Sequence, residues 1–128
     1  MAEETKKLNI LLVEDDVFMV DLLGRELTRA GFSMVVAGNG KEAVEKFESV
    51  HPDLILLDLI LPDENGFDAL RQIRRKPGGP EAKVIVFSNI AEMLHVDEAK
   101  RLGAVDYLIK ANYTLAEVVE KVRKHLAV

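Results

Sequence analysis

Acidic residues, a hydroxyl and an amine stand where short apolar runs of this sequence end. Glu14-Asp15-Asp16 follows one run and Asp58 follows another, while Ser88 and Lys110 each end one of two later runs. Carboxylates that gather in one place repel one another unless a cation lies between them. Mg²⁺ binds a few carboxylates and keeps several of its waters. The pattern therefore predicts Mg²⁺, or Mn²⁺ in its place, as the cofactor.

Asp58 is the most informative single residue. It interrupts an otherwise apolar stretch, residues 54–61, where a lone carboxylate is costly unless it is paired or bound to metal. An aspartate that merely caps the following turn is the alternative interpretation. With Lys110 to neutralise charge and Ser88 to donate a hydrogen bond, the side chains suit a phosphoryl group. Asp58 would then be the nucleophile that accepts it.

The neighbouring residues also have purely structural interpretations. Asp16 is suited to cap the helix that follows it, which leaves Glu14 and Asp15 without a capping role. Lys110 could extend its amine into solvent, and Ser88 could be an ordinary hydroxyl at a strand end.

Elements that would position these residues alternate along the chain, with a repeat of about 25 residues. Strands are predicted at residues 8–13, 34–37, 54–57, 84–87 and 105–109, and helices begin near residues 16, 39, 65, 93 and 114. Gly31 and Gly103 are predicted to end two helices, Gly31 in a left-handed conformation. Asn39 with Glu42, and Thr114 with Glu117, have the spacing of capping boxes.

The strands at 8–13, 54–57 and 84–87 are continuously apolar, as is typical of parallel strands covered on both faces. We therefore predict an α/β fold, a doubly wound parallel sheet of five strands with five helices. The alternation alone does not determine the strand order. We choose the flavodoxin-like order 2-1-3-4-5 because the first and third strands both end in acidic residues, and ligands bind beyond the carboxyl ends of such strands.

Composition narrows the class of protein. The 128 residues suit a single domain, which we expect to span residues 1–128. A net charge of −5 argues against direct binding to nucleic acid or an anionic membrane. The absence of cysteine excludes disulfides and thiol chemistry. The polar start, residues 1–9, is not a signal peptide and no apolar stretch could span a bilayer, so we expect a cytoplasmic protein. The histidines lack ligand spacing and are predicted to be surface residues: His51, His95 and His125.

The chain resembles the receiver domain of bacterial two-component response regulators of the chemotaxis-regulator type, from about Leu8 to Leu126. Four motifs in order carry the resemblance: Ile-Leu-Leu-Val-Glu14-Asp15-Asp16, Asp58-Leu-Ile-Leu-Pro62 followed by Gly66, Val-Ile-Val-Phe-Ser88, and Gly103-Ala-Val-Asp-Tyr107-Leu-Ile-Lys110. The resemblance implies that Asp58 is the phosphoacceptor and Asp15 a direct metal ligand. It further implies that Glu14 acts mainly through metal-bound water and that the backbone carbonyl of Ile60 is another ligand.

The remaining matches are Lys110 with the family's lysine, Ser88 with its switch hydroxyl and Tyr107 with its aromatic switch. Tyr107 could instead be ordinary core packing. The resemblance implies a phosphorylation-activated signalling switch. A sensor histidine kinase or a phosphotransfer protein would supply the phosphoryl group in a Mg²⁺-dependent reaction. Phosphorylation would then shift the face formed by residues 93–102, 105–109 and 114–126, which contacts a downstream effector protein or domain.

We expect the protein to be a signalling phosphoacceptor that catalyses its own phosphotransfer and dephosphorylation, rather than a conventional turnover enzyme. It would be a monomer or a phosphorylation-dependent dimer. Three other functions are alternatives. A flavodoxin-like flavin-binding module would need a phosphate loop where Glu14-Asp15-Asp16 stands, and an aspartyl phosphatase would need an acid where Ile60 stands. A pseudo-receiver that docks a partner without phosphorylation is the third.

Two residues depart from the family pattern. Ala111 follows Lys110 where the family usually has proline. The Lys110–Ala111 bond is therefore either trans with a reshaped loop, or a strained cis bond that costs about 3–4 kcal/mol. Asn89 follows Ser88 where the family commonly has a small residue, and its bulk could narrow access to Asp58.

Overall fold

The computed structural model describes residues 7–128, in which five parallel strands form one sheet. The strand order is β2-β1-β3-β4-β5, so the predicted order is confirmed. The strands are β1 (Asn9–Val13), β2 (Ser33–Ala37), β3 (Leu54–Leu57), β4 (Val84–Ser88) and β5 (Asp106–Ile109). Most of the polar start that we predicted not to be a signal peptide, residues 1–6, lies outside the described residues.

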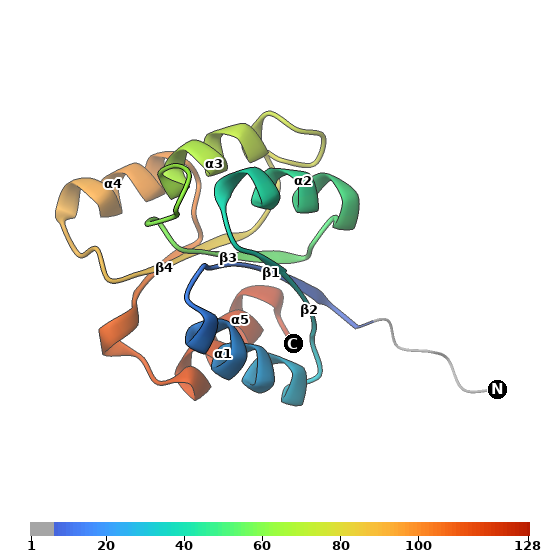
Figure 1. The fold of residues 1–128 in the computed structure, drawn as a ribbon. Helices are drawn as coiled ribbons and strands as arrows, with labels where there is room; N and C mark the ends of the chain where they lie inside the picture. Colours follow the sequence, from blue (N-terminus) through green and yellow to red (C-terminus); the bar gives the residue numbers. More distant parts are fainter. Residues whose placement is uncertain (1–6) are drawn as a thin grey trace.

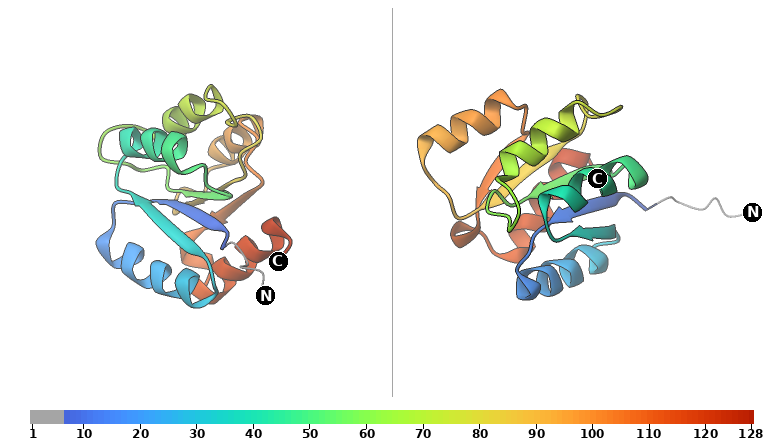
Figure 2. Two further views of the ribbon diagram at one scale, coloured as in Figure 1. Left: turned by 90° about the vertical axis from the view of Figure 1, so that its right-hand side faces the viewer. Right: turned by 45° about the horizontal axis from the view of Figure 1, so that its top comes forward.

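Five helices cover the sheet, as predicted, and a short 3₁₀ turn, η1 (Lys110–Asn112), follows β5. The helices are α1 (Val17–Arg29), α2 (Gly40–Val50), α3 (Gly66–Arg74), α4 (Met93–Arg101) and α5 (Leu115–Leu126). Helices α1 and α5 lie on one face of the sheet, and α2, α3 and α4 lie on the other (Figure 1). Two further views show the same three layers (Figure 2). No helix between residues 7 and 128 is long and apolar enough to cross a membrane.

Both faces of the interior strand β1 are apolar because each face belongs to a separate core. Ile10 and Leu12 pack in the core beneath α1 and α5. Leu11 and Val13 pack in the core beneath α2 and α3. Alternate residues of a strand point to opposite faces, so a strand covered on both sides must be apolar throughout. Polar residues can therefore enter only where the strand ends, at the carboxyl edge of the sheet.

The caps explain where most helices begin. The side chain of Asp16 accepts hydrogen bonds from the N–H groups of Phe18 and Met19, at 2.9 and 3.3 Å. The predicted capping box of Thr114 and Glu117 is present at α5. Gly31 and Gly103 end α1 and α4 with φ of 97° and 78°, so the two predicted helix ends are confirmed.

The predicted capping box at the start of α2 is wrong. Asn39 does cap the helix, but the Glu42 carboxylate accepts from the Asn39 side-chain amide at 3.2 Å. The first N–H groups of α2 instead have a partner from another loop. The Asp63 carboxylate accepts from Gly40 and Lys41 at 2.8 and 3.0 Å. This contact ties the β3–α3 loop to the start of α2.

The predicted exposure holds for one histidine of the three. His51 is exposed, at the C-terminal end of α2. His125 is mostly buried because its ring nitrogen pairs with Asp106 at 2.8 Å across the gap between α5 and β5. His95 is half-buried because its ring stacks on Phe67 of α3, with ring centres 6.1 Å apart.

Candidate functional site

The strand register brings the acidic residues together. Val13 of β1 pairs with Leu57 of β3. The residue after each strand is still held by the sheet, because the Asp58 N–H donates to the Val13 carbonyl at 3.0 Å and the Glu14 N–H donates to the Ala37 carbonyl at 2.9 Å. Glu14 and Asp58 therefore emerge side by side at the carboxyl edge. Both are buried, with exposed fractions of 2% and 7%.

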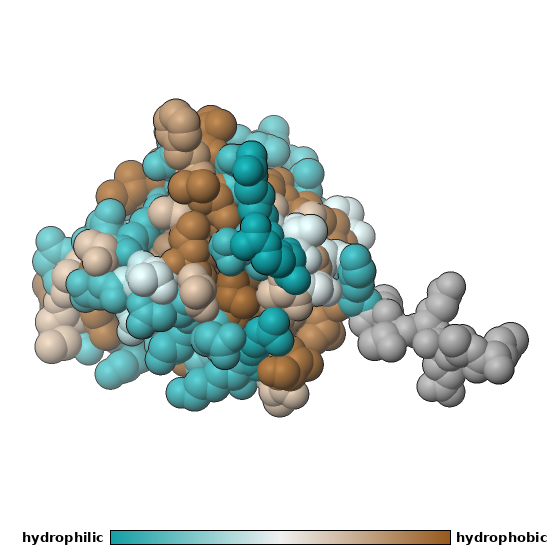
Figure 3. All heavy atoms as spheres, turned by 90° about the horizontal axis from the view of Figure 1, so that it is seen from below, coloured by the Kyte–Doolittle hydropathy of each residue, from teal (hydrophilic) through white to brown (hydrophobic). Residues whose placement is uncertain are grey.

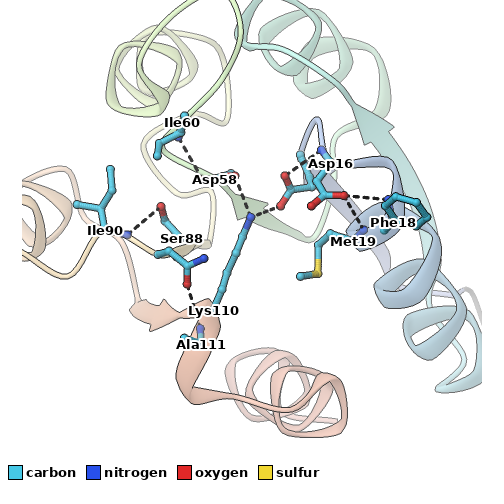
Figure 4. A network of polar contacts seen from close by, with 11 residues as sticks. Asp16, Phe18, Met19, Asp58, Ile60, Ser88, Ile90, Lys110 and Ala111 are labelled. Atoms are coloured by element: carbon cyan, nitrogen blue, oxygen red, sulfur yellow. Dashed lines mark hydrogen bonds and ion pairs between the residues drawn. The ribbon is translucent and has the colours of Figure 1, made fainter.

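Lys110 reaches both buried carboxylates from the end of β5. Its ammonium donates to Asp58 Oδ2 at 2.9 Å and to Glu14 Oε1. Figure 4 shows the lysine side chain extended from its turn toward Asp58. The ammonium also lies 5.5 Å from the centre of the Phe87 ring. The alternative in which Lys110 extends into solvent is wrong, since the side chain is only 13% exposed.

The electrostatics follow from this burial. Desolvation raises the pKa of Glu14, and the nearby negative charge of Asp58 adds to the increase against the opposing hydrogen bond from Lys110. Desolvation alone would lower the pKa of Lys110. Its hydrogen bonds and charge interactions with Glu14 and Asp58 outweigh that effect and raise this pKa above the usual value. Both shifts favour the protonated, more positive forms of these two groups.

Three carboxylates form a group suited to a metal ion. Glu14, Asp15 and Asp58 each place one oxygen within 4.8 Å of the others. Asp15 is exposed, so the group opens to solvent. Hard carboxylate oxygens with room for water are the ligands that Mg²⁺ prefers, so this donor set fits the ion. The Ile60 N–H donates to Asp58 Oδ1 at 3.2 Å, which holds the loop that carries the predicted carbonyl ligand beside the group.

A glycine allows α3 to begin directly against Asp58. A Cβ atom on Gly66 would overlap the carbonyl oxygen of Asp58, which is part of the backbone and cannot swing away. The Gly66 N–H donates to the Leu59 carbonyl at 2.8 Å, and Ile60 and Asn65 form a bridge that closes the loop. The glycine in the motif is thus required by close backbone approach.

Ser88 and Tyr107 are linked through Ile90. The Ser88 hydroxyl is fully buried, and its oxygen accepts from the Ile90 N–H at 3.4 Å (Figure 4). The Tyr107 hydroxyl donates to the Ile90 carbonyl at 2.5 Å. Sequence reasoning selected the serine and the tyrosine but not this link, because no pattern of residue types marks a backbone contact between two loops.

The Lys110–Ala111 bond is trans, as are the other peptide bonds of residues 7–128. Of the two alternatives, the reshaped loop is the one present, and it takes the form of η1. Asn89 has a specific partner in this turn. Its side-chain oxygen accepts a hydrogen bond from the Ala111 N–H at 3.0 Å. Sequence reasoning considered these two residues separately and missed their contact.

Comparison with known proteins identifies the family. Residues 10–123 match the response regulator receiver domain. The chain belongs to this family. This receiver domain is 37% identical over 116 residues to the chemotaxis protein CheY of Thermotoga maritima, covering 90% of this chain and 94% of that protein.

Solved receiver domains have the same fold. A CheY-like receiver domain from Methanospirillum hungatei superposes with a TM-score of 0.87 at 25% identity, covering 95% of each chain. The receiver domain of a sensor histidine kinase from Pseudomonas aeruginosa superposes with a TM-score of 0.85 at 27% identity, covering 96% of this chain and all of that one. That structure has a magnesium ion coordinated in its active site cleft.

Proposed function

We propose that this receiver domain is a phosphorylation switch in which Asp58 accepts a phosphoryl group. The donor is the phosphohistidine of a sensor histidine kinase or a phosphotransfer protein. The observation that carries the proposal is the convergence of a buried aspartate, a largely buried lysine and two further carboxylates at one edge of the sheet. Such a group is expensive to bury, and a reaction with an anionic phosphoryl group accounts for it.

The transfer exchanges one bond to phosphorus for another. A carboxylate oxygen of Asp58 attacks the phosphorus, the bond to the histidine nitrogen breaks, and the imidazole leaves with its electron pair. Lys110 neutralises charge on the phosphoryl oxygens, since its ammonium already lies 2.9 Å from Asp58. The Ser88 hydroxyl donates a hydrogen bond to one of these oxygens after it turns from Ile90.

Asp15, Asp58 and the backbone carbonyl of Ile60 would hold Mg²⁺ or Mn²⁺, and Glu14 would act through metal-bound water. The ion supplies positive charge to the phosphoryl oxygens when it is bound. The magnesium in the Pseudomonas aeruginosa receiver domain supports this choice. The exposed position of Asp15 leaves the ion open to the donor.

The proposed product is a signal rather than a chemical released in turnover. The domain hydrolyses its own acyl phosphate and resets. While phosphorylated, it presents a changed α4–β5–α5 face to a downstream effector. We further propose that residues 1–128 act as a single cytoplasmic domain, either a monomer or a phosphorylation-dependent dimer, without direct contact to nucleic acid.

Incubation with acetyl phosphate tests the assignment without a partner protein. With Mg²⁺ or Mn²⁺ present, mass spectrometry should find one added phosphoryl group, and chelation of the metal should prevent the addition. Asp58→Asn should abolish it. Asp53→Asn is the matched control, because Asp53 binds the Asn9 N–H at the opposite edge of the sheet. Unchanged phosphorylation of Asp58→Asn would refute the phosphoacceptor assignment, and a parent that binds metal but takes no phosphoryl group would be a pseudo-receiver.

A further inference from the structure

Asn89 and Ala111 meet because the sheet register extends beyond the strands. Ser88 at the end of β4 pairs with Ile109 at the end of β5. The next residues along each strand, Asn89 and Lys110, therefore leave the sheet together. The Asn89 side-chain oxygen accepts from the Ala111 N–H at 3.0 Å, and Ala111 lies in the turn from which Lys110 extends (Figure 4).

Asn89 supplies the Ala111 N–H with a hydrogen-bond acceptor that the turn itself does not provide. Ala111 is in the first residues of η1, and the N–H groups at the start of a helical turn have no carbonyl partner within it. A proline at this position would have no N–H to donate. The hydrogen bond therefore depends on both departures from the family pattern at once, and it joins the β4–α4 loop to the turn after β5.

We propose that Asn89 is a positioning residue for Lys110 and acts through the Ala111 N–H. Lysine has a long, flexible side chain, so the placement of its ammonium depends on a fixed backbone below it. Here the ammonium must reach Glu14 and Asp58 together. Asn89 holds the turn at the base of the Lys110 side chain, and the Phe87 ring lies beneath the ammonium at the other end.

Positioning and steric obstruction predict opposite effects of Asn89→Ala on the rate of Asp58 phosphorylation. If the side chain of Asn89 merely narrowed the entrance, Asn89→Ala would accelerate phosphorylation of Asp58. If Asn89 positions Lys110, the same change slows it by about threefold to tenfold, the range expected for one hydrogen bond. This kinetic part rests on the proposed function, whereas the hydrogen bond itself does not.

The kinetic test follows Mg²⁺-dependent phosphorylation by acetyl phosphate in the parent, Asn89→Ala and Asn112→Ala. Asn112 is an exposed asparagine of the same turn and serves as the matched control. The loss in Asn89→Ala should appear in the maximal rate rather than in the donor concentration needed to reach half of it. When Asn89→Ala is combined with Lys110→Ala, the phosphorylation rate should fall no further than in Lys110→Ala alone. Faster phosphorylation of Asn89→Ala, or an equal loss with Lys110 absent, would overturn the proposal.

Amide hydrogen exchange tests the positioning without any phosphoryl group. The Ala111 N–H should exchange several-fold faster in Asn89→Ala than in the parent, and at the parent rate in Asn112→Ala. The Lys110 ammonium signal in nitrogen-resolved NMR spectra should broaden only in Asn89→Ala. Unchanged exchange and an unchanged ammonium signal would overturn the proposal. A parent that takes no phosphoryl group but shows both effects would refute the proposed function and leave the positioning role of Asn89 intact.

Discussion

At the scale of single residues, the balance of charge at the site explains why a second cation is needed. Glu14 and Asp58 are buried and share one lysine, while Asp15 adds a third carboxylate. One positive charge against three negative ones is tolerable because Asp15 faces solvent. The phosphorylated Asp58 would carry about two negative charges in place of the single charge of its carboxylate. Lys110 alone could not balance them, so a divalent ion is required for the reaction that we propose.

Two isoleucines beside Asp58 should prolong the life of its phosphoryl group. The N–H of Ile60 donates to Asp58, and the N–H of Ile90 donates to Ser88, so both residues border the acceptor. Hydrolysis needs a water held in line with the phosphorus, and neither apolar side chain can hold one. Replacing Ile60 with Asn and Ile90 with Glu should speed dephosphorylation roughly tenfold, or about 1.4 kcal/mol of barrier.

The decay of the phosphorylated protein after removal of the donor measures this effect. Leu94→Asn is a suitable control, because Leu94 is an exposed apolar residue on α4. A double variant that decays no faster than the parent would show that these isoleucines do not set the lifetime.

At the scale of secondary-structure elements, Arg74 fastens α3 to its neighbours. Its guanidinium donates to four backbone carbonyls, at distances of 2.6 to 3.1 Å: those of Leu102, Gly79, Ala82 and Gly103. Desolvation lowers its pKa, although the group stays charged.

Arg74→Lys should destabilise the fold by about 2–4 kcal/mol, because an ammonium cannot reach all four acceptors. Urea unfolding measures the loss, and the exposed Arg75→Lys should change stability little. Equal stability of the two variants would contradict this role.

Asp106 and His125 join β5 to the end of α5, and their contact makes stability depend on pH. Burial alone would raise the pKa of Asp106, but hydrogen bonds from His125 and from the Tyr107 N–H, with the charge of Lys121, lower it below 3.8. A carboxyl whose folded-state pKa is lowered stabilises the fold above its unfolded pKa. That contribution disappears as the pH falls through the folded value.

Asp106→Asn should therefore lower the free energy of unfolding at neutral pH by about 1–2 kcal/mol. The difference from the parent should shrink as the pH falls below 3.8. Urea unfolding over this range measures it. Asp21→Asn is the control, because Asp21 is an exposed aspartate whose pair with Arg25 lies on the surface. A difference that stays constant across the range would show that the carboxylate charge is not responsible.

Strands and helices could be predicted where the local sequence determines them. The continuous apolar runs predicted β1, β3 and β4, and the residues after these strands predicted the site, because parallel strands end at one edge. Contacts between loops were not predictable. The tie of Asp63 to α2 and that of Asn89 to Ala111 depend on how two turns face each other in space. The burial of His125 likewise depends on its distance from Asp106 and not on its neighbours in sequence.

At the scale of the whole molecule, both helical layers offer exposed apolar side chains to a partner. Figure 3 shows the side formed by α1 and α5, where an apolar band crosses a largely hydrophilic surface. Exposed apolar side chains on α1 include Val17, Phe18 and Leu22, and those on α4 include Met93 and Leu94. The site lies at the edge between the layers, so a change there can be transmitted to either. The contacts of Ser88 favour the layer that contains α4.

A continuous path of contacts runs from the site to the α4–β5–α5 face. The Ser88 oxygen accepts from the Ile90 N–H, and the Ile90 carbonyl accepts from the Tyr107 hydroxyl on β5. Under the proposed phosphorylation, Ser88 would turn toward the phosphoryl group and release Ile90, which would change the constraint on Tyr107. We therefore expect a switch that moves two loops and one aromatic side chain without altering the sheet.

Amide NMR with Mg²⁺ and beryllofluoride, a phosphoryl mimic, tests this expectation. Signals from Met93 to Val119 should shift together with those around Asp58. Tyr107→Phe removes the hydroxyl that binds Ile90 and should reduce the shifts in β5 and α5 by at least about half if this bond carries most of the coupling. Tyr113→Phe is the matched control. Shifts confined to the surroundings of Asp58 would refute the proposed output face. A Tyr107→Phe spectrum that matches the parent in β5 and α5 would instead show that the change reaches this face by another route.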